Sequence, residues 1–500
     1  MKTIKYILLS AVLVSFTACN DPEDFVDAPE EIIAPDLTSG SADLSNYVAI
    51  GASFTAGFTD NALFMASQEN SFPNIMSQMF AQANGGTFNQ PWTNDNVGGL
   101  LLGGNPIAAP RLYFDGAGPA LLPAAPTTEV SNILSGPFNN MGVPGAKSFH
   151  IVANGYGNIA GIGSFANPYF VRMASNPNAS VLEDALAQNP TFFTISEIGG
   201  NDVLGYATSG GSGVDQTGNL DPATYGSNDI TDPNVFAQVV STMVTALSSN
   251  GSKGVIATVP SIIYLPHFTT VPHNPVPLDA ATAGAVNQGY APYNGGLLQA
   301  ESFGFISAEE RAQRTINFAE GQNAVVIIDE DLTDLSGLGL PSYRQATAND
   351  LLVLPSSSFI GTLADPNNPL SVNGVAVPLA DNWVLTPEEQ ENIAVATQAY
   401  NNTIMALANS NENLALLDLD AILIEASTTG IEFDEFIMST DLVMGGLVSL
   451  DGIHLTARGY ALMANKFLEA MDISFGSNFV ESGALAKAGD YPTNYSPMLQ

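Results

Sequence analysis

The chain has few charged residues, and those that it has are mostly acidic. Charged residues make up 12% of its 500 residues, about half of the usual ~25%. Only 12 are Lys or Arg, against 49 Asp or Glu, which gives a formal net charge of −37. This balance excludes a nucleic-acid-binding protein, because phosphate neutralisation needs clusters of Lys and Arg. It also excludes attraction to an anionic bilayer by charge alone.

The apolar content is too high for a disordered chain. Hydrophobic residues make up 45% of the sequence, and the mean hydropathy is +0.15. Such a composition provides enough apolar surface to offset the entropy lost on ordering. A chain of 52.2 kDa is long enough for one large domain or two medium ones.

The chain contains a single cysteine, Cys19, so it has no intramolecular disulfide. Two lysines precede an apolar run, Ile7 to Phe16, that is too short to span a membrane. We therefore predict a signal peptide over residues 1–18. Cys19 stands where cleavage is expected, so the segment resembles a bacterial lipoprotein signal in which Cys19 is lipidated. The alternative is an ordinary secretory peptide with an accidental cysteine.

The residues after Cys19 are acidic and rich in proline and serine. We interpret residues 19–45 as a flexible tether between a lipid anchor and the folded domain. The acidic run resembles the surface-export signal of lipoproteins in Bacteroidetes-type outer membranes. We therefore expect a cell-envelope protein, lipid-anchored to the outer membrane and exposed at the surface, with an outer-membrane protein as a candidate partner. Cleavage would make the net charge about −39, because it removes two lysines and no acid.

Apolar runs that suit buried strands alternate along the chain with helix signals. Asp232-Pro233 is an N-cap followed by proline at the first helical position. Thr456 is the expected N-cap of the last and clearest helix. This alternation predicts an α/β fold with a mostly parallel sheet covered by helices on both faces. The expected strands are residues 47–50, 191–198, 254–259, 324–328 and 414–419, and the expected helices are 180–188, 232–251, one from 307, 386–408 and one from 456.

Three stretches have weak periodicity and many turn residues. They cover residues 84–137, 204–232 and 260–307, and we interpret them as long loop insertions in one continuous domain over residues 46–475. Residues 476–500 are expected to form a C-terminal tail.

Two motifs contain residues able to perform nucleophilic catalysis. Ser53 lies in the run GASFTAG, directly after the first expected strand, where open α/β sheets place ligands. This run is not the G-x-S-x-G elbow, because Thr55 occupies the last glycine position. Asp451 lies three residues before His454, so its carboxylate can hold the imidazole in one tautomer while the other ring nitrogen acts as a base. Taken alone, each motif is more often turn or packing chemistry.

Two glycine-containing turns could supply hydrogen-bond donors beside such a pair. Asn201 lies in Gly199-Gly200-Asn201-Asp202, after an expected strand, and its side-chain amide can donate into the crevice. Gly145, in the run NMGVPGA, would present a bare backbone N–H. Taken alone, each is again an ordinary turn.

Together and in this order, the four motifs resemble those of the SGNH, or GDSL, serine hydrolases. The resemblance implies an SGNH-hydrolase-like, flavodoxin-like three-layer sandwich. It also implies a catalytic triad of Ser53, His454 and Asp451, and an oxyanion hole formed by Ser53, Gly145 and Asn201. One departure is Ala52, where the family usually has aspartate. It leads us to expect altered hydrogen bonding around the nucleophile.

The resemblance implies serine-dependent hydrolysis of carboxylic esters, with no cofactor and no metal. No D-x-[DN]-x-[DN]-G loop is present, and we interpret the many acids as solvated surface. The favoured substrates are lipid or other acyl esters. One alternative is a carbohydrate acetyl esterase, with aromatic residues of the insertions stacking on sugars. Another is a non-catalytic surface lipoprotein that binds hydrophobic ligands. The aromatic residues that could stack on sugars in the first alternative are Trp92, Tyr113, Tyr156 and Tyr206.

Overall fold

The computed structural model describes residues 34–500. The predicted signal peptide, Cys19 and most of the predicted tether therefore lie outside the described residues. Among the described residues, no helix combines the length and apolarity needed to cross a bilayer.

A five-stranded parallel sheet forms the centre of the fold. Its strands in chain order are β1 Tyr47–Gly51, β6 Asn140–Gly142, β7 Phe192–Ser196, β8 Lys253–Ala257 and β15 Leu414–Leu417. They lie side by side in the order β15-β8-β7-β1-β6, and every neighbouring pair is parallel. In chain order this is the 2-1-3-4-5 arrangement, in which the strand order reverses beside β1.

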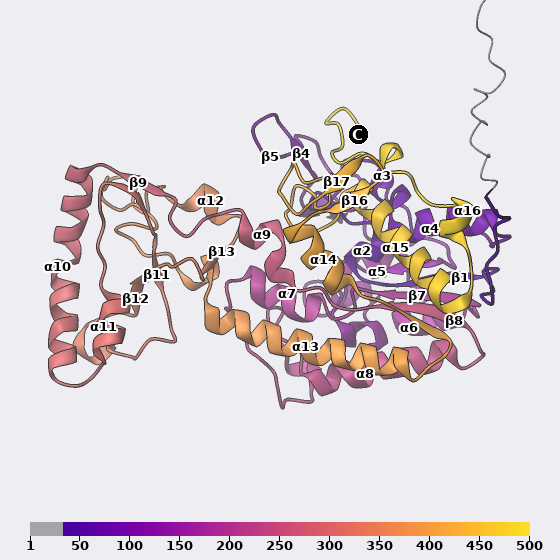
Figure 1. The fold of residues 1–500 in the computed structure, drawn as a ribbon, viewed down its shortest axis with the longest axis horizontal. Coiled ribbons are helices and arrows are strands. Elements are labelled where there is room, and N and C mark those ends of the chain that lie inside the picture. The colour runs from indigo at the N-terminus through magenta and orange to yellow at the C-terminus, as the bar shows by residue number, and fades with distance from the viewer. Residues whose placement is uncertain (1–33) are drawn as a thin grey trace, which may run out of the picture. The chain divides into compact units, whose positions relative to one another are not determined.

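Helices cover both faces of the sheet, which confirms the predicted α/β class. Figure 1 shows α8 Pro233–Ser248 and α13 Pro387–Asn409 on one side, and α4 Phe72–Gln82 and α15 Ala457–Phe475 on the other. The main hydrophobic core lies between these layers and includes β1 and β7, which are buried along their whole length. The other helices of this part are α2 Ser53–Ala56, α3 Met65–Glu69, α5 Pro168–Met173, α6 Val181–Leu186, α7 Asn201–Thr208 and α14 Leu419–Thr428.

The predicted helix starts are confirmed by their caps. The Asp232 carboxylate accepts the N–H groups of Asn234 and Val235 at the start of α8, and Thr386 forms a capping box with Glu389 at the start of α13. Thr456 caps α15 by accepting the Gly459 N–H. Such caps satisfy N–H groups that have no partner within the helix.

Residues 271–384 build a second hydrophobic core, which the sequence did not predict. The predicted insertion 260–307 is therefore too short, because the segment continues to residue 384. The predicted strand 324–328 is present as β11 Val326–Ile328. It forms an antiparallel pair with β12 Tyr343–Gln345, however, and is not part of the central sheet. The segment also contains β9 Val276–Leu278, α10 Ala280–Ser302, α11 Ala308–Arg314, β10 Gly321–Asn323, β13 Leu351–Leu352, α12 Ser356–Phe359 and β14 Val384–Leu385, and α9 Pro266–Thr269 precedes it (Figure 1).

The other two predicted insertions contain little regular structure. Residues 84–137 form two short hairpins, and residues 204–232 continue α7 into a loop with one 3₁₀ turn, Pro222–Thr224. The hairpin strands are β2 Leu100–Leu102, β3 Asn105–Ala108, β4 Leu112–Phe114 and β5 Pro119–Leu121.

Both predicted flexible ends are packed where the structure describes them. From Leu37 onward the chain belongs to one compact unit, and the N–H of Ser41 donates to the carbonyl of Phe475 at 2.9 Å. The tether therefore ends earlier than residue 45. The predicted tail packs against the domain, since Arg111 Nη2 donates to the carbonyls of Ser496 and Leu499 at 2.7 and 2.9 Å. The tail also contains α16 Phe479–Ser482. The Ala488 N–H of the tail donates to Asp434 at 2.7 Å, in the turn between β16 Ile431–Phe433 and β17 Phe436–Met438.

Candidate active site

The candidate site lies at the carboxyl ends of β1 and β7, the two strands beside the reversal in strand order. Ser53 follows β1, while Glu197 and Asn201 follow β7. Open α/β sheets bind ligands in the crevice at this point, because the connections on either side diverge there. His454 and Asp451 reach the same place from the loop before α15.

Two glycines let the turn that contains Ser53 lie close against its neighbours. A Cβ at Gly51 would lie 2.6 Å from the Ser196 carbonyl oxygen, and a Cβ at Gly142 would lie 2.3 Å from the Ala56 nitrogen. Any side chain at these positions would push α2 away from the sheet. Ser53 is thereby held in a sharp turn and is 7% exposed.

Asp451 and His454 form a hydrogen-bonded pair. The distance from His454 Nδ1 to Asp451 Oδ2 is 2.9 Å, and the Asp451 Oδ1 accepts the backbone N–H groups of Ile453 and His454, each at 2.8 Å. The pair therefore belongs to one tight turn. Gly452 in this turn has φ +75°, and a Cβ there would lie 2.9 Å from the His267 nitrogen.

The Asp451 carboxylate is stabilised in its charged form. Burial alone would raise the pKa of Asp451, but the neighbouring His454 and the backbone donors outweigh it and hold this pKa well below its usual range. A further donor comes from across the site, since the Asn61 N–H reaches Asp451 Oδ2 at 2.8 Å. An ionised Asp451 keeps the proton of His454 on Nδ1, which leaves Nε2 as the basic nitrogen.

Two phenylalanines flank the imidazole of His454. The ring centroid of Phe58 lies 4.7 Å from that of His454, and that of Phe54 lies 5.9 Å away in an edge-on arrangement. These contacts limit rotation of the imidazole and exclude water from one side of it. The His454 side chain remains 12% exposed.

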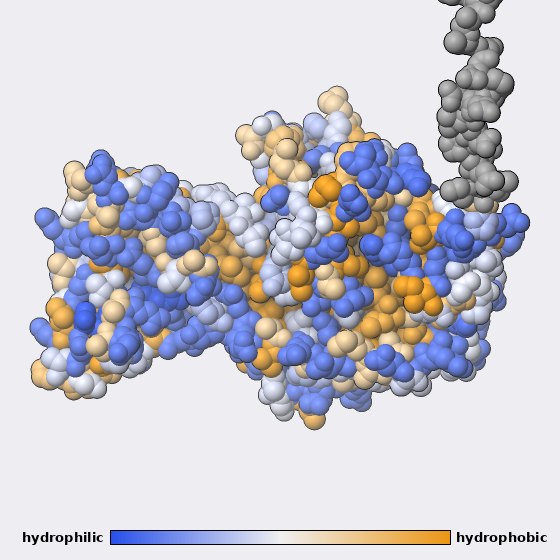
Figure 2. Space-filling model, viewed as in Figure 1, coloured by the Kyte–Doolittle hydropathy of each residue, from blue (hydrophilic) through white to orange (hydrophobic). Residues whose placement is uncertain are grey.

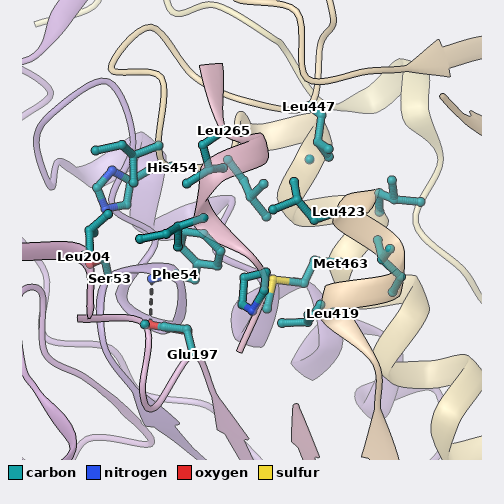
Figure 3. Close-up of a pocket in the computed structure, with 18 of the residues that line it drawn as sticks. Ser53, Phe54, Glu197, Leu204, Leu265, Leu419, Leu423, Leu447, His454 and Met463 are labelled. Carbon is teal, nitrogen blue, oxygen red and sulfur yellow. Dashed lines mark hydrogen bonds between the residues drawn. The ribbon is translucent and has the colours of Figure 1, made fainter. Parts of the chain in front are cut away.

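Glu197 takes the place of a side-chain cap at the turn that holds Ser53. The N-cap residue of α2, Ala52, offers no side-chain acceptor. Instead, Glu197 Oε1 accepts the N–H groups of Ala52, Phe54 and Thr55 at 2.6, 2.9 and 3.3 Å. Figure 3 shows the bond between Phe54 and Glu197. Glu197 is 6% exposed and has a positive φ of 46°, which is uncommon outside glycine. The neighbouring structure thus imposes a costly conformation on a buried acid.

These three bonds leave the N–H of Ser53 as the available backbone donor of the turn. Among residues 34–500, the N–H groups of Ser53 and Gly145 have no intramolecular acceptor. The Asn201 Nδ2 donates to the Ala146 carbonyl at 3.0 Å, which places the amide beside the residue that follows Gly145. A carboxamide nitrogen has two donors, so the second one stays available.

An apolar pocket opens beside these groups. It encloses about 890 Å³ including its mouth, and Ser53, Asn201 and His454 line it. Gly145 is not part of its lining. Figure 3 shows Ser53 and His454 at one end, with the pocket extending between α14 and α15 past Leu423 and Met463. The remaining apolar lining comes from Phe54, Leu204, Pro260, Ile262, Leu265, Leu419, Ile422, Leu447, Ile453, Leu455 and Leu462.

The aromatic residues proposed for sugar stacking do not line this pocket. Tyr156 and Tyr206 are buried elsewhere, at 3% and 5% exposure, and Trp92 is 40% exposed. Tyr113 lies in the hairpin strand β4.

Sequence reasoning missed Glu197, the turn at Asn61 and the apolar lining. The signal for Glu197 was an acid inside the otherwise apolar run FFTISEIGG. Neither the pairing of Asn61 with Asp451 nor the pocket has a local signal, because both depend on segments far apart in the chain.

The chain was compared with protein-family models, with curated proteins and with solved structures, and none of these comparisons found a match.

We predict that Glu197 makes the protein less stable as the pH rises. Burial raises the pKa of Glu197 to about 7, although the N–H donors favour its charged form. Below about pH 4.5, its ordinary pKa, the folded and unfolded chains are both protonated and no penalty exists. Between pH 4.5 and 7 the unfolded chain loses the proton first, so the free energy of unfolding falls, by about 3 kcal/mol in all.

Thermal unfolding from pH 4.5 to 8 tests this prediction. Glu197→Gln should lose less stability than the wild type over this range, because glutamine does not ionise. The exposed Glu412→Gln is the control and should follow the wild type. Equal pH profiles for Glu197→Gln and the wild type would show that Glu197 carries no such penalty.

Proposed function

We propose that this protein is a serine hydrolase that cleaves carboxylic esters, with Ser53 as nucleophile. The observation that supports it best is the Asp451–His454 pair at 2.9 Å, because its His454 lines one pocket together with Ser53, a serine at a strand–helix turn. The resemblance of the four motifs to those of SGNH hydrolases supports the same reaction. So does the position of the site at the reversal of strand order.

In this mechanism, His454 accepts the Ser53 proton as the hydroxyl oxygen attacks the ester carbonyl carbon. Asp451 stabilises the imidazolium that forms. The oxyanion accepts hydrogen bonds from the N–H groups of Ser53 and Gly145 and from the Asn201 amide. His454 then protonates the departing alcohol and leaves an acyl-enzyme on Ser53. Water, deprotonated by His454, releases the acid and restores Ser53.

The pocket favours acyl esters over sugar acetates. Its lining is almost entirely apolar, and its one cationic residue, Lys466, is paired with Glu469 at 2.9 Å. Residues Gly459 to Lys466 of α15 line it over two turns, about 10 Å of helix. An extended chain of about eight carbons spans that length, at ~1.3 Å per tetrahedral carbon. We therefore propose medium-chain acyl groups as substrates.

Hydrolysis of p-nitrophenyl esters from acetate to palmitate tests this function. We expect turnover that rises from acetate and is highest at octanoate or longer. A maximum at acetate would instead favour a carbohydrate acetyl esterase. Absence of turnover across the whole series, with a folded protein, would favour a lipoprotein that binds apolar ligands without cleaving them.

We predict that Leu423→Trp shortens the pocket. Leu423 is 7% exposed and lines it from α14, so a larger side chain should exclude the end of a medium acyl chain. We expect kcat/KM for octanoate to fall about tenfold or more, with acetate hardly affected, since apolar pockets discriminate on this scale. The measurement is the same ester series.

The matched control is Ile424→Trp on the same helix, because Ile424 is 39% exposed and outside the pocket lining. It should keep the wild-type preference. If Leu423→Trp also keeps that preference, the acyl chain does not occupy this pocket.

We also propose that Cys19 anchors the protein to the outer membrane through a lipid. The support is the position of this single cysteine after the predicted signal peptide. We predict that radiolabelled palmitate enters the wild-type protein in cells and that Cys19→Ser abolishes it. Equal labelling of both would contradict the lipoprotein signal. The candidate outer-membrane partner stays a proposal that this labelling does not address.

A further inference from the structure

Three carboxylates meet away from the candidate active site. One oxygen of each of Glu330, Asp381 and Glu389 lies within 4.8 Å of an oxygen of the other two. They come from separate segments, since Glu330 follows β11, Asp381 begins a 3₁₀ turn before β14, and Glu389 lies in the first turn of α13. No single loop motif predicts this cluster for that reason.

Glu389 is an unusual member of the cluster because it is buried. It is 4% exposed, and its Oε2 accepts the Thr386 N–H at 2.6 Å as part of the helix cap. Its Oε1 is buried and has no hydrogen-bond partner among the described residues. A buried carboxylate oxygen without a donor costs free energy that a cation would recover.

The surroundings of Glu389 are built to admit this side chain. A Cβ at Gly211, in the loop after α7, would lie only 1.8 Å from Glu389 Oε1. Gly211 also has φ +79°, a conformation that favours glycine. Only glycine therefore leaves room for the carboxylate at this position.

The cluster is not neutralised by the protein itself. Within residues 34–500, none of the three carboxylates forms a salt bridge. Burial raises the pKa of Glu389 to about 8, and the carboxylates of Asp381 and Glu330 add to the effect. Burial and Asp381 also raise the pKa of Glu330. Such mutual repulsion is relieved either by protons or by a cation.

We propose that Glu330, Asp381 and Glu389 form a binding site for Ca²⁺. Hard divalent cations prefer carboxylate oxygens, and Ca²⁺ accepts sites built by the protein alone, whereas Mg²⁺ keeps several waters and is reluctant to lose them. The ion would join the 271–384 segment, through Glu330 and Asp381, to α13, which packs beside the central sheet. The site is independent of the proposed hydrolase function.

Isothermal titration calorimetry of the full-length protein in detergent, after removal of metals, tests this site with CaCl₂. We expect one Ca²⁺ per chain, with a Kd of ~10⁻⁴–10⁻³ M or tighter and weaker binding of Mg²⁺. Glu389→Gln should weaken binding about tenfold or more, and glutamine still completes the helix cap. A double variant, Glu330→Gln with Asp381→Asn, alters only the less buried ligands. It tests Ca²⁺ binding in place of Glu389→Gln if that variant does not fold.

The matched control is Glu391→Gln, an exposed acid on the same helix. It should bind Ca²⁺ like the wild type, which separates this site from weak binding to the 49 acids of the chain. Ca²⁺ should also raise the melting temperature of the wild type and leave that of the double variant unchanged. The proposal is overturned if the wild type shows no single-site binding at millimolar Ca²⁺, or if the double variant binds as tightly as the wild type.

Discussion

Ser53→Ala is expected to abolish ester hydrolysis, with a fall in kcat of about 10³-fold or more. Ser53 follows β1 and lines the pocket together with His454, and alanine removes its hydroxyl without adding bulk. The remaining rate should equal that of the uncatalysed reaction plus the contribution of the oxyanion donors, which are the backbone N–H groups at positions 53 and 145 and the Asn201 amide. Octanoate hydrolysis by the purified proteins measures the effect.

The substitution should leave the fold intact, so the melting temperature is the control for this variant. The Ser53 side chain makes no hydrogen bond among the described residues that alanine would break. A folded Ser53→Ala protein that retains the wild-type rate would show that the reaction uses another nucleophile.

Asp451→Asn is expected to lower kcat by about 10³–10⁴-fold, with a smaller effect on KM. Asparagine keeps an oxygen to accept the N–H groups of Ile453 and His454, so the turn should persist. Its amide, however, would donate to Nδ1 of His454. The proton of the imidazole would then lie on Nε2, the nitrogen that accepts the proton of Ser53 in the proposed mechanism.

Asp441→Asn in the preceding loop is the matched control, because it makes the same change of charge at an exposed position. It should hydrolyse octanoate like the wild type. If Asp451→Asn retains more than about a tenth of the wild-type kcat, the tautomer of His454 is not set by this carboxylate.

Local signals predicted the central part of the fold. The apolar run of β1 and the cap of α8 are encoded by neighbouring residues, and the structure has both close to their predicted bounds. β6 was not predicted, because a strand of three residues, Asn140–Gly142, has no periodicity. β11 was predicted as a strand but assigned to the wrong sheet, since an apolar run does not specify its partner.

The second core was missed for the same physical reason. Residues 271–384 alternate short strands, turns and helices whose apolar residues face one another only after folding. α10 is 23 residues long, but glycines and Pro292 interrupt its apolar pattern. The packed ends of the chain show the same limit, because Ser41 and Ser496 form hydrogen bonds with Phe475 and Arg111, which lie hundreds of positions away in the sequence.

The four motifs predicted from the sequence lie around one site in the structure, yet the sequence did not indicate how the turn that contains Ser53 is held. Ala52 predicted altered hydrogen bonding there. The structure places the carboxylate of Glu197 against three N–H groups of that turn. A carboxylate from the end of the next strand can replace one from the turn itself, because β1 and β7 are neighbours in the sheet.

Labelling with a fluorophosphonate, followed by peptide mass spectrometry, tests directly whether Ser53 is an activated nucleophile. An activated serine attacks this probe without any need to know the natural ester. We predict one adduct, on Ser53 of the wild type, much slower labelling of His454→Ala, and no labelling of Ser53→Ala. A folded wild-type protein that stays unlabelled, or an adduct on a different residue, would contradict the proposed role of Ser53.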